Sequence, residues 1–301
     1  MQRLLLPLLA ALGALVLPGW AHATFGGANG DLAVTFTQTD RVFYDSRIEL
    51  IEPAGANAGS FGECQDDTTS SHDDPVACPS QPDFSPDGSR VAFALGSRLA
   101  VADADGTNTV VLRSLTDFDS DPSWSPKGTS LVFAGREAGQ NNLYSVNPDG
   151  AGLRQLTIHG GRAPAWSRRG ELAYVRNGAI FRVRPRVGHT VRVAEGERPD
   201  FSPSGLTVLY ARDQNVYSVA TRRGARPRLR LRHADRAVFS PDARHLAYVG
   251  RTDRLAGGEF YLSIIISRAD GRGARIVRRG RELPVGSTFA NYVDVAWRPE
   301  P

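Results

Sequence analysis

Cysteine, histidine and long apolar segments are scarce in this sequence of 301 residues. There are two cysteines and six scattered histidines. The chain has neither the Gly-x-Ser-x-Gly motif of serine hydrolases nor a nucleotide-binding glycine loop. After the N-terminal segment there is no apolar run long enough to span a membrane. Hydrophobic residues still make up 41% of the chain, which excludes a disordered protein and favours a folded one.

Residues 1–23 have the features of a signal peptide. One positive charge, Arg3, precedes an apolar stretch at residues 4–17, and an Ala-His-Ala tripeptide follows. The two alanines of this tripeptide are the small residues that signal peptidase recognises, so we expect cleavage before Thr24. The alternative is an uncleaved buried or membrane helix. Cleavage predicts a secreted or periplasmic protein of residues 24–301, without a transmembrane segment.

The two cysteines, Cys64 and Cys78, lie in one polar stretch. In an oxidising compartment, a disulfide is the natural interpretation of such a pair. Closing a loop of about 15 residues would stabilise the protein by about 3 kcal/mol. A metal site with His72 is the alternative, but this spacing matches no zinc pattern. The sequence therefore predicts a disulfide inside an insertion at residues 53–81.

Charge is distributed unevenly along the chain. Residues 1–150 have 8 basic and 19 acidic side chains, whereas residues 151–301 have 28 basic and 13 acidic ones. Such asymmetry is typical of charged faces that steer partners. The alternative is a bias in composition with no role in steering partners, because all the basic residues but one are arginine. In the arginine-rich residues 228–232, we interpret the arginines as protection of an outer strand against aggregation, and we expect no nucleic-acid partner.

A phrase of the form Pro-x-aromatic-Ser-Pro-Asp-Gly recurs along the chain. After it comes a short apolar strand, then another strand that runs into an Asp-Gly turn, as at Asp149. The copies are about 45 residues apart, which is the length of a four-stranded propeller blade. The aromatic position of the phrase is occupied in six copies, by Phe84, Trp124, Trp166, Phe201, Phe239 and Trp297.

The two ends of the repeat array are incomplete in complementary ways. Residues 32–34 form an apolar strand with no aromatic phrase before it, and residues 295–299 form an aromatic phrase with no strand after it. Joining them would close a ring and remove the exposed edges of an open stack. The sequence therefore predicts an all-β, six-bladed β-propeller with four antiparallel strands per blade. Its N- and C-terminal strands share one blade.

The repeated phrase resembles the TolB-type (PD40, WD40-like) β-propeller repeat. The likeness covers residues 29–299 and occurs in every predicted blade. It implies that the aromatic phrase lies on the innermost strand of each blade. TolB proteins carry an α/β domain before the propeller. We find no such domain here, so their partners are not carried over.

Enzymatic chemistry has little support in the sequence. Asp117, Asp119 and Asp121 alternate along an extended segment, but Pro122 and Gly128 stand where a calcium loop needs glycine and glutamate. We predict no catalytic residue, no metal site and no cofactor. The alternative is a small hydrolase or lyase, similar to a lactonase or an oligosaccharide lyase, with its site in the central channel.

Residues that precede the aromatic phrases are expected at one mouth of the channel, where propellers usually bind ligands. They carry mixed charges and could instead pair with one another. We expect a monomeric, non-enzymatic binding or scaffold protein that engages a protein, peptide or cell-envelope polymer there. The candidate ligand-binding residues are Asp121, Arg162, Arg198, Asp235 and Asp294.

Overall fold

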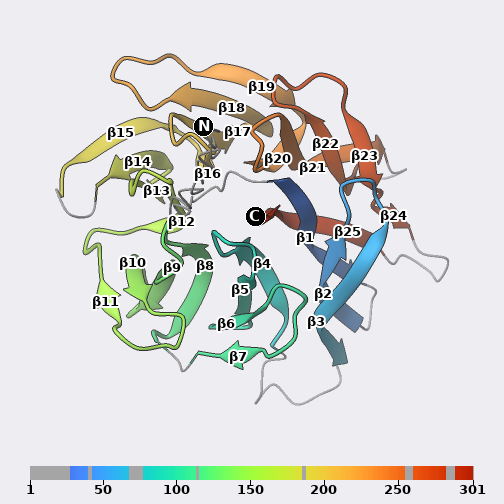
Figure 1. The fold of residues 1–301 in the computed structure, drawn as a ribbon, viewed down its shortest axis with the longest axis horizontal. Helices are drawn as coiled ribbons and strands as arrows, with labels where there is room; N and C mark the ends of the chain where they lie inside the picture. Colours follow the sequence, from blue (N-terminus) through green and yellow to red (C-terminus); the bar gives the residue numbers. More distant parts are fainter. Residues whose placement is uncertain are drawn as a thin grey trace, which may run out of the picture.

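The described part of the protein consists of strands arranged around a central axis (Figure 1). A computed structural model describes residues 28–39, 43–67, 77–112, 115–184, 188–254, 260–282 and 289–300. Within these ranges there is no helix, and therefore none that could cross a membrane. The predicted signal peptide, residues 1–23, lies outside the described residues.

The strands form six antiparallel sheets, here numbered as blades 1 to 6. Blade 1 has the order β24 (Arg281–Glu282), β25 (Phe289–Glu300), β1 (Ala28–Thr39), β2 (Phe43–Ile51) and β3 (Asn57–Asp67). Blade 2 contains β4 (Pro79–Phe84), β5 (Arg90–Leu95), β6 (Arg98–Asp103) and β7 (Val110–Val111). Blade 3 contains β8 (Phe118–Trp124), β9 (Leu131–Glu137), β10 (Gln140–Val146) and β11 (Arg154–Gln155).

The second half of the ring repeats this pattern. Blade 4 contains β12 (Arg162–Trp166), β13 (Leu172–Arg176), β14 (Ala179–Val183) and β15 (Thr190–Glu195). Blade 5 contains β16 (Glu197–Phe201), β17 (Thr207–Arg212), β18 (Asn215–Ala220) and β19 (Arg228–Arg232). Blade 6 contains β20 (Ala234–Phe239), β21 (His245–Arg254), β22 (Phe260–Arg268) and β23 (Arg275–Arg278). The predicted six-bladed propeller is confirmed, with the short β24 as an addition to blade 1.

The hydrophobic core is divided into clusters that lie between neighbouring blades. In one of them, Trp124 and Phe133 of blade 3 pack against Leu99 of blade 2. In another, Leu32 and Trp297 of blade 1 are joined by apolar side chains of blade 6. The described clusters link every adjacent pair of blades. A blade is therefore stable only when its neighbours are present, as expected for a repeat protein.

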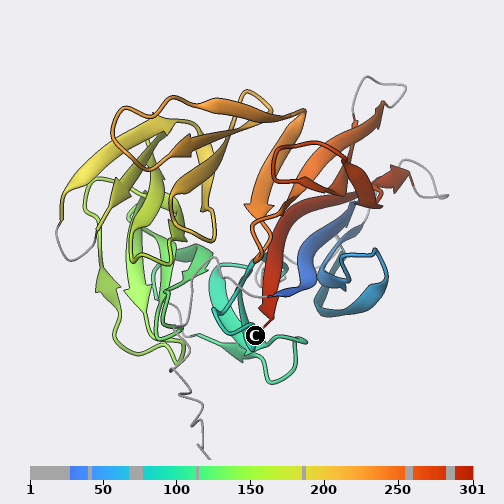
Figure 2. The ribbon, with the colours of Figure 1, turned by 45° about the horizontal axis from the view of Figure 1, so that its top comes forward.

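The chain closes the ring by pairing its two terminal strands. β1 and β25 are antiparallel neighbours, and Leu32 lies opposite Trp297 in their register. Both views of the ribbon show the blue β1 beside the red β25 (Figures 1 and 2). The indole Nε1 of Trp297 donates a hydrogen bond of 3.0 Å to the Gly30 carbonyl. The predicted blade shared by the two ends is confirmed.

The Ser-Pro-Asp-Gly part of the phrase builds the turn between the first two strands of a blade. In blade 2, the Ser85 hydroxyl donates to the Asp87 carboxylate at 2.6 Å, and that carboxylate accepts from the Ser89 amide. Gly88 has a φ of 68°, a left-handed conformation that favours glycine. Ala243 stands at the same place in blade 6 with a φ of 60°.

About half of the segment 53–81, predicted to be an insertion, belongs to strands of the regular blades. It contains β3, the outermost strand of blade 1, and the start of β4, the innermost strand of blade 2. Few apolar residues alternate along β3, so its sequence does not look like that of a strand. Residues 68–76 lie outside the described residues. Cys64 and Cys78 form the predicted disulfide, which joins β3 to the segment just before β4.

Candidate functional site

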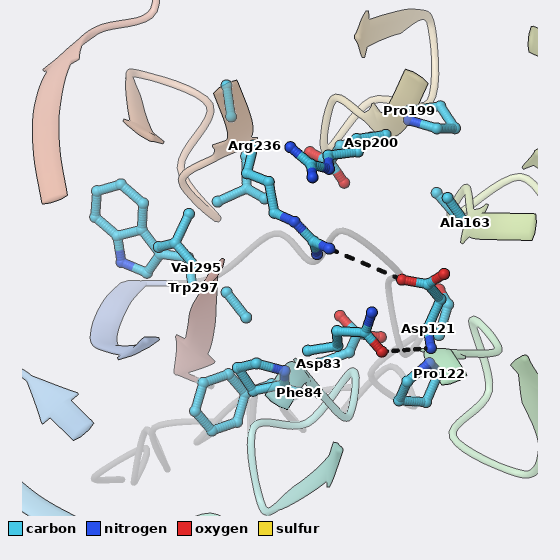
Figure 3. Close-up of a pocket in the computed structure, with 18 of the residues that line it drawn as sticks. Asp83, Phe84, Asp121, Pro122, Ala163, Pro199, Asp200, Arg236, Val295 and Trp297 are labelled. Carbon is cyan, nitrogen blue, oxygen red and sulfur yellow. Dashed lines mark hydrogen bonds and ion pairs between the residues drawn. The ribbon is translucent and has the colours of Figure 1, made fainter. Parts of the chain in front are cut away.

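The central channel is a cavity of about 140 Å³ lined by the innermost strands of all six blades. These strands are β25, β4, β8, β12, β16 and β20, each beside the next around the ring. Their side chains converge on the axis from every direction (Figure 3). The channel is therefore the one place where residues from all the repeats can act on the same ligand.

A β-bulge in the innermost strand of five blades presents one side chain to the channel, and four of the five side chains are polar. In blade 3, for example, the register shifts between Ser120 and Ser123, and Asp121 has a φ of 50°. This left-handed backbone costs about 1 kcal/mol in a residue other than glycine. It recurs at the position three residues before the aromatic in five blades, at Gln81, Asp121, Ala163, Arg198 and Arg236.

Proline follows the bulge residue in four of the blades, and its chemistry fits this position. The innermost strand is the inner edge of its sheet, so a residue without an N–H group breaks no ladder there. Blades 6 and 1 have Ala237 and Val295 instead. In the other blades the residues are Pro82, Pro122, Pro164 and Pro199.

Arg236 lies across the channel between two carboxylates. Its guanidinium forms an ion pair with Asp294 of the neighbouring blade 1. It also reaches Asp121 on the opposite side of the ring, where Nη2 lies 3.9 Å from Oδ1 (Figure 3). The Asp121 amide donates a hydrogen bond of 2.9 Å to the Gln81 side chain. These contacts connect four blades across the channel.

Two further ion pairs join neighbouring blades beside the channel. Arg198 pairs with Asp235, and Arg162 pairs with Glu197 at 2.6 Å. The side chains of these pairs are between 37% and 46% exposed, so they are accessible to a ligand. They contribute little stability because solvent screens them.

The structure brings three of the five predicted ligand-binding residues to the channel centre or its wall. Asp121 and Arg198 line the cavity, and Asp294 is held beside it by Arg236. Arg162 and Asp235 do not line it, since they lie one position earlier than the bulge residue. The residues in their place are Ala163 and Arg236. Counting three residues back from the aromatic in every blade would have found Arg236 and also Gln81.

Two carboxyl groups lie deeper in the channel, each directly before an aromatic of the phrase. Asp83 accepts a hydrogen bond of 2.8 Å from the Trp124 amide of the next blade. Asp200 accepts one of 3.3 Å from the Phe239 amide in the same way. Burial raises the pKa of Asp83 to about 7 and that of Asp200 to about 8, and the charge of Asp83 adds to the rise at Asp200. Their carboxyl groups therefore tie neighbouring blades together from inside the channel.

Comparison with known proteins places these features in a family. The TolB β-propeller domain family (PD40) matches residues 75–237, which is more than half of the chain. The chain belongs to this family. The Tol-Pal system protein TolB of Xanthomonas campestris is 34% identical over 87 residues, and that of Xanthomonas oryzae 33%. Each match covers 27% of this chain and 20% of the relative, so the chain matches about a fifth of their length.

Solved structures show the same fold. TolB from Acinetobacter baumannii superimposes on 90% of this TolB-family propeller with a TM-score of 0.65, and 67% of that chain is covered. A putative TolB from Agrobacterium tumefaciens covers 87% of this chain and 98% of its own, with a TM-score of 0.57. Their sequence identities are 16% and 17%. These likenesses establish the propeller fold and nothing finer.

The channel of this TolB-family protein is suited to binding. Its half-exposed ion pairs can exchange partners with the charged groups of a ligand at small cost. Among the residues that the structure describes, no three of His, Cys, Asp and Glu gather closely enough to hold a metal ion. The described histidines His159, His189, His233 and His245 are not among the cavity-lining residues. The geometry thus offers recognition by charge and hydrogen bonding.

Proposed function

We propose that the protein is an exported, non-enzymatic binding propeller. Its partner is a protein, peptide or cell-envelope polymer that engages the bulge residues at the channel mouth. Export is supported by the signal-like residues 1–23 and by the disulfide, which suits an oxidising compartment. An envelope setting is supported by the name of the Xanthomonas relatives, Tol-Pal system protein.

The observation that carries this proposal is the repeated bulge. Strained backbone recurs at the channel-facing positions of five blades, and such strain gathers at functional sites. It aims Asp121, Arg198 and Arg236 at one cavity. A ligand with neighbouring positive and negative groups, such as a peptide with charged side chains, would replace the internal ion pairs with its own.

Affinity capture tests this proposal. The mature chain, residues 24–301, is used to retain binding partners from an envelope fraction, with chemical crosslinking and mass spectrometry. We expect a specific partner whose crosslinks map to the channel mouth. The variant Arg198→Glu reverses a mouth charge and should lose that partner. The control Arg154→Glu reverses an exposed charge on the outer strand β11 and should keep it.

Two results would contradict the proposal. One is the recovery of no specific protein or glycan by the wild-type chain. The other is equal capture by Arg198→Glu and by the wild type. Metal-dependent turnover of lactones or oligosaccharides would instead support the enzymatic alternative.

A further inference from the structure

One face of the ring carries two kinds of turn from every blade. In a four-stranded antiparallel blade, successive connections alternate between the two ends of the sheet. The turn after the innermost strand and the turn before the outermost strand therefore share a face, which we call the turn face. The channel bulges lie toward the start of the innermost strands, as at Arg198 in the second position of β16. The channel mouth thus opens on the opposite face.

An acidic groove crosses the turn face between blades 2 and 3. It has a volume of about 700 Å³ and is lined by residues that include Asp103, Val110 and Asp149. Asp149 is exposed, and Val110 is 57% exposed. The one basic residue of the groove, Arg90, is already engaged, because it donates to the Gly128 carbonyl and lies over the Trp124 ring. Among the residues that the structure describes, neither Asp103 nor Asp149 forms an ion pair, so the groove presents two carboxylates beside an exposed aliphatic side chain.

An arginine turn projects from the same face of blade 5. It consists of residues 221–227, which connect β18 to β19, and the first residue of β19. It carries Arg222, Arg223, Arg226 and Arg228, all exposed. Within the described ranges none of these four forms an ion pair. The next residue, Leu229, is 41% exposed. The arginine turn therefore presents unpaired positive charge beside an exposed aliphatic side chain, as the groove presents negative charge.

These two features lie on opposite sides of the ring. Blade 5 is three places from blade 2, and Figure 1 shows β19 and β7 across the channel from each other. A two-fold axis in the plane of the turn face would place each copy's arginine turn over the other copy's groove. Such an isologous contact is the commonest form of homodimer. It makes two equivalent charge-complementary contacts at once.

We propose that two copies of this chain associate turn face to turn face, with each arginine turn seated in the acidic groove of the other copy. A basic peptide would satisfy only the groove, and a polyanion would satisfy only the arginines. A second copy satisfies both with the spacing that the ring imposes. The channel mouth stays free on the outer faces of the pair, so this proposal is independent of the proposed function. It departs from the monomer that the sequence led us to expect.

Sedimentation velocity of the mature chain tests the proposal. We expect a reversible dimer whose dissociation increases with salt, because exposed ion pairs are screened. The turn variant R222E/R223E and the groove variant V110R/D149R should each bind themselves roughly tenfold or more weakly than wild type, since like charges then face each other. The control Arg98→Glu reverses a charge at the start of β6, on the opposite face, and should dimerise normally.

Mixing the two variants is the decisive experiment. In the mixed pair, the acidic turn of one variant meets the basic groove of the other at one contact. At the second contact an unchanged arginine turn meets an unchanged acidic groove, so an equimolar mixture should form heterodimers. Circular dichroism checks that each variant is folded. If the groove variant does not fold, V110R alone replaces it, because that change removes no turn hydrogen bond. A monomeric wild type at low salt, unchanged dimerisation of the turn variant, or failure of folded variants to associate would overturn the proposal.

Discussion

At the scale of single residues, the last position of the Ser-Pro-Asp-Gly turn is glycine in four blades and alanine in one. Gly88, Gly128, Gly170 and Gly205 all have φ values near 70° at the last position of the turn. Ala243 adopts a φ of 60° at the same position, although a side chain makes this conformation costly. The backbone hydrogen bond of the turn is still formed, since the Ala243 amide donates to the Ser240 carbonyl at 2.8 Å. Blade 6 therefore carries local strain that the corresponding turns of blades 2 to 5 avoid.

Replacing Ala243 with glycine should stabilise the protein. The left-handed strain is relieved, and the added freedom of glycine in the unfolded chain offsets part of the gain, so we expect an increase of about 0.5–1 kcal/mol in the free energy of unfolding. Urea denaturation measures it. The control Ala54→Gly is in an exposed turn without positive φ and should destabilise slightly. Equal effects of the two changes would contradict the explanation.

The two channel acids should make stability depend on pH. Their pKa values are about 7 and 8 in the folded protein, against 3.8 for an ordinary aspartate. Between about pH 4 and pH 8 the folded protein therefore keeps protons that the unfolded chain releases. The free energy of unfolding should fall as pH rises through this range, by up to about 1.4 kcal/mol per pH unit for each group.

The double variant D83N/D200N should flatten this pH dependence. An amide oxygen can still accept the hydrogen bonds from the Trp124 and Phe239 amides, but it does not titrate. Urea denaturation at several pH values measures the slope. The control Asp213→Asn removes a carboxylate that is 85% exposed and should leave the slope unchanged. An unaltered slope in the double variant would show that these acids titrate normally.

At the scale of strands, the disulfide connects two neighbouring blades. Cys64 lies on β3, and Cys78 lies just before β4, 14 positions later. The bond therefore joins the outermost strand of one blade to the start of the innermost strand of the next. The sequence between the two cysteines is polar.

Removing this bond should lower stability markedly. For a closed loop of this length, the variant C64S/C78S should lose about 3 kcal/mol of unfolding free energy. Urea denaturation of the variant and of the oxidised wild type measures the difference. Reduced wild-type protein serves as the control and should resemble the variant. A variant as stable as the oxidised protein would mean that the disulfide adds nothing to the pairing and packing of β3 and β4.

Strands with strong apolar patterns could be predicted from the sequence, and irregular ones could not. The aromatic phrase and the apolar strand after it give the number of blades and their closure, because both are needed to fill the cores between blades. β3 was missed because its residues are mostly polar or small. In the channel, Arg162 and Asp235 precede by one position the residues that line the cavity, Ala163 and Arg236. A bulge adds a residue to one strand, so side-chain direction cannot be counted from simple alternation.

At the scale of the whole molecule, stability depends on the closed ring. Each core cluster is shared between two blades, so a gap at any place exposes two apolar surfaces. The closing strand β25 contacts more than its own blade. The Arg298 Nε donates a hydrogen bond of 2.9 Å to the Gly88 carbonyl in blade 2. The last residues of the chain therefore lock the turn of blade 2 to the closed blade 1.

A pair of glycine variants isolates this closing contact. A Cβ at Gly88 would collide with the Pro299 carbonyl oxygen, whereas a Cβ at Gly170 would meet open space. Their φ values are 68° and 72°, so backbone strain in both variants should lower the free energy of unfolding by a similar amount, about 1–2 kcal/mol. Gly88→Ala should cost about 1–3 kcal/mol more because of the collision. Urea denaturation followed by tryptophan fluorescence and circular dichroism measures this difference and shows whether the ring still unfolds as one unit. Equal losses in the two variants would mean that the end of β25 contributes nothing to closure through this turn.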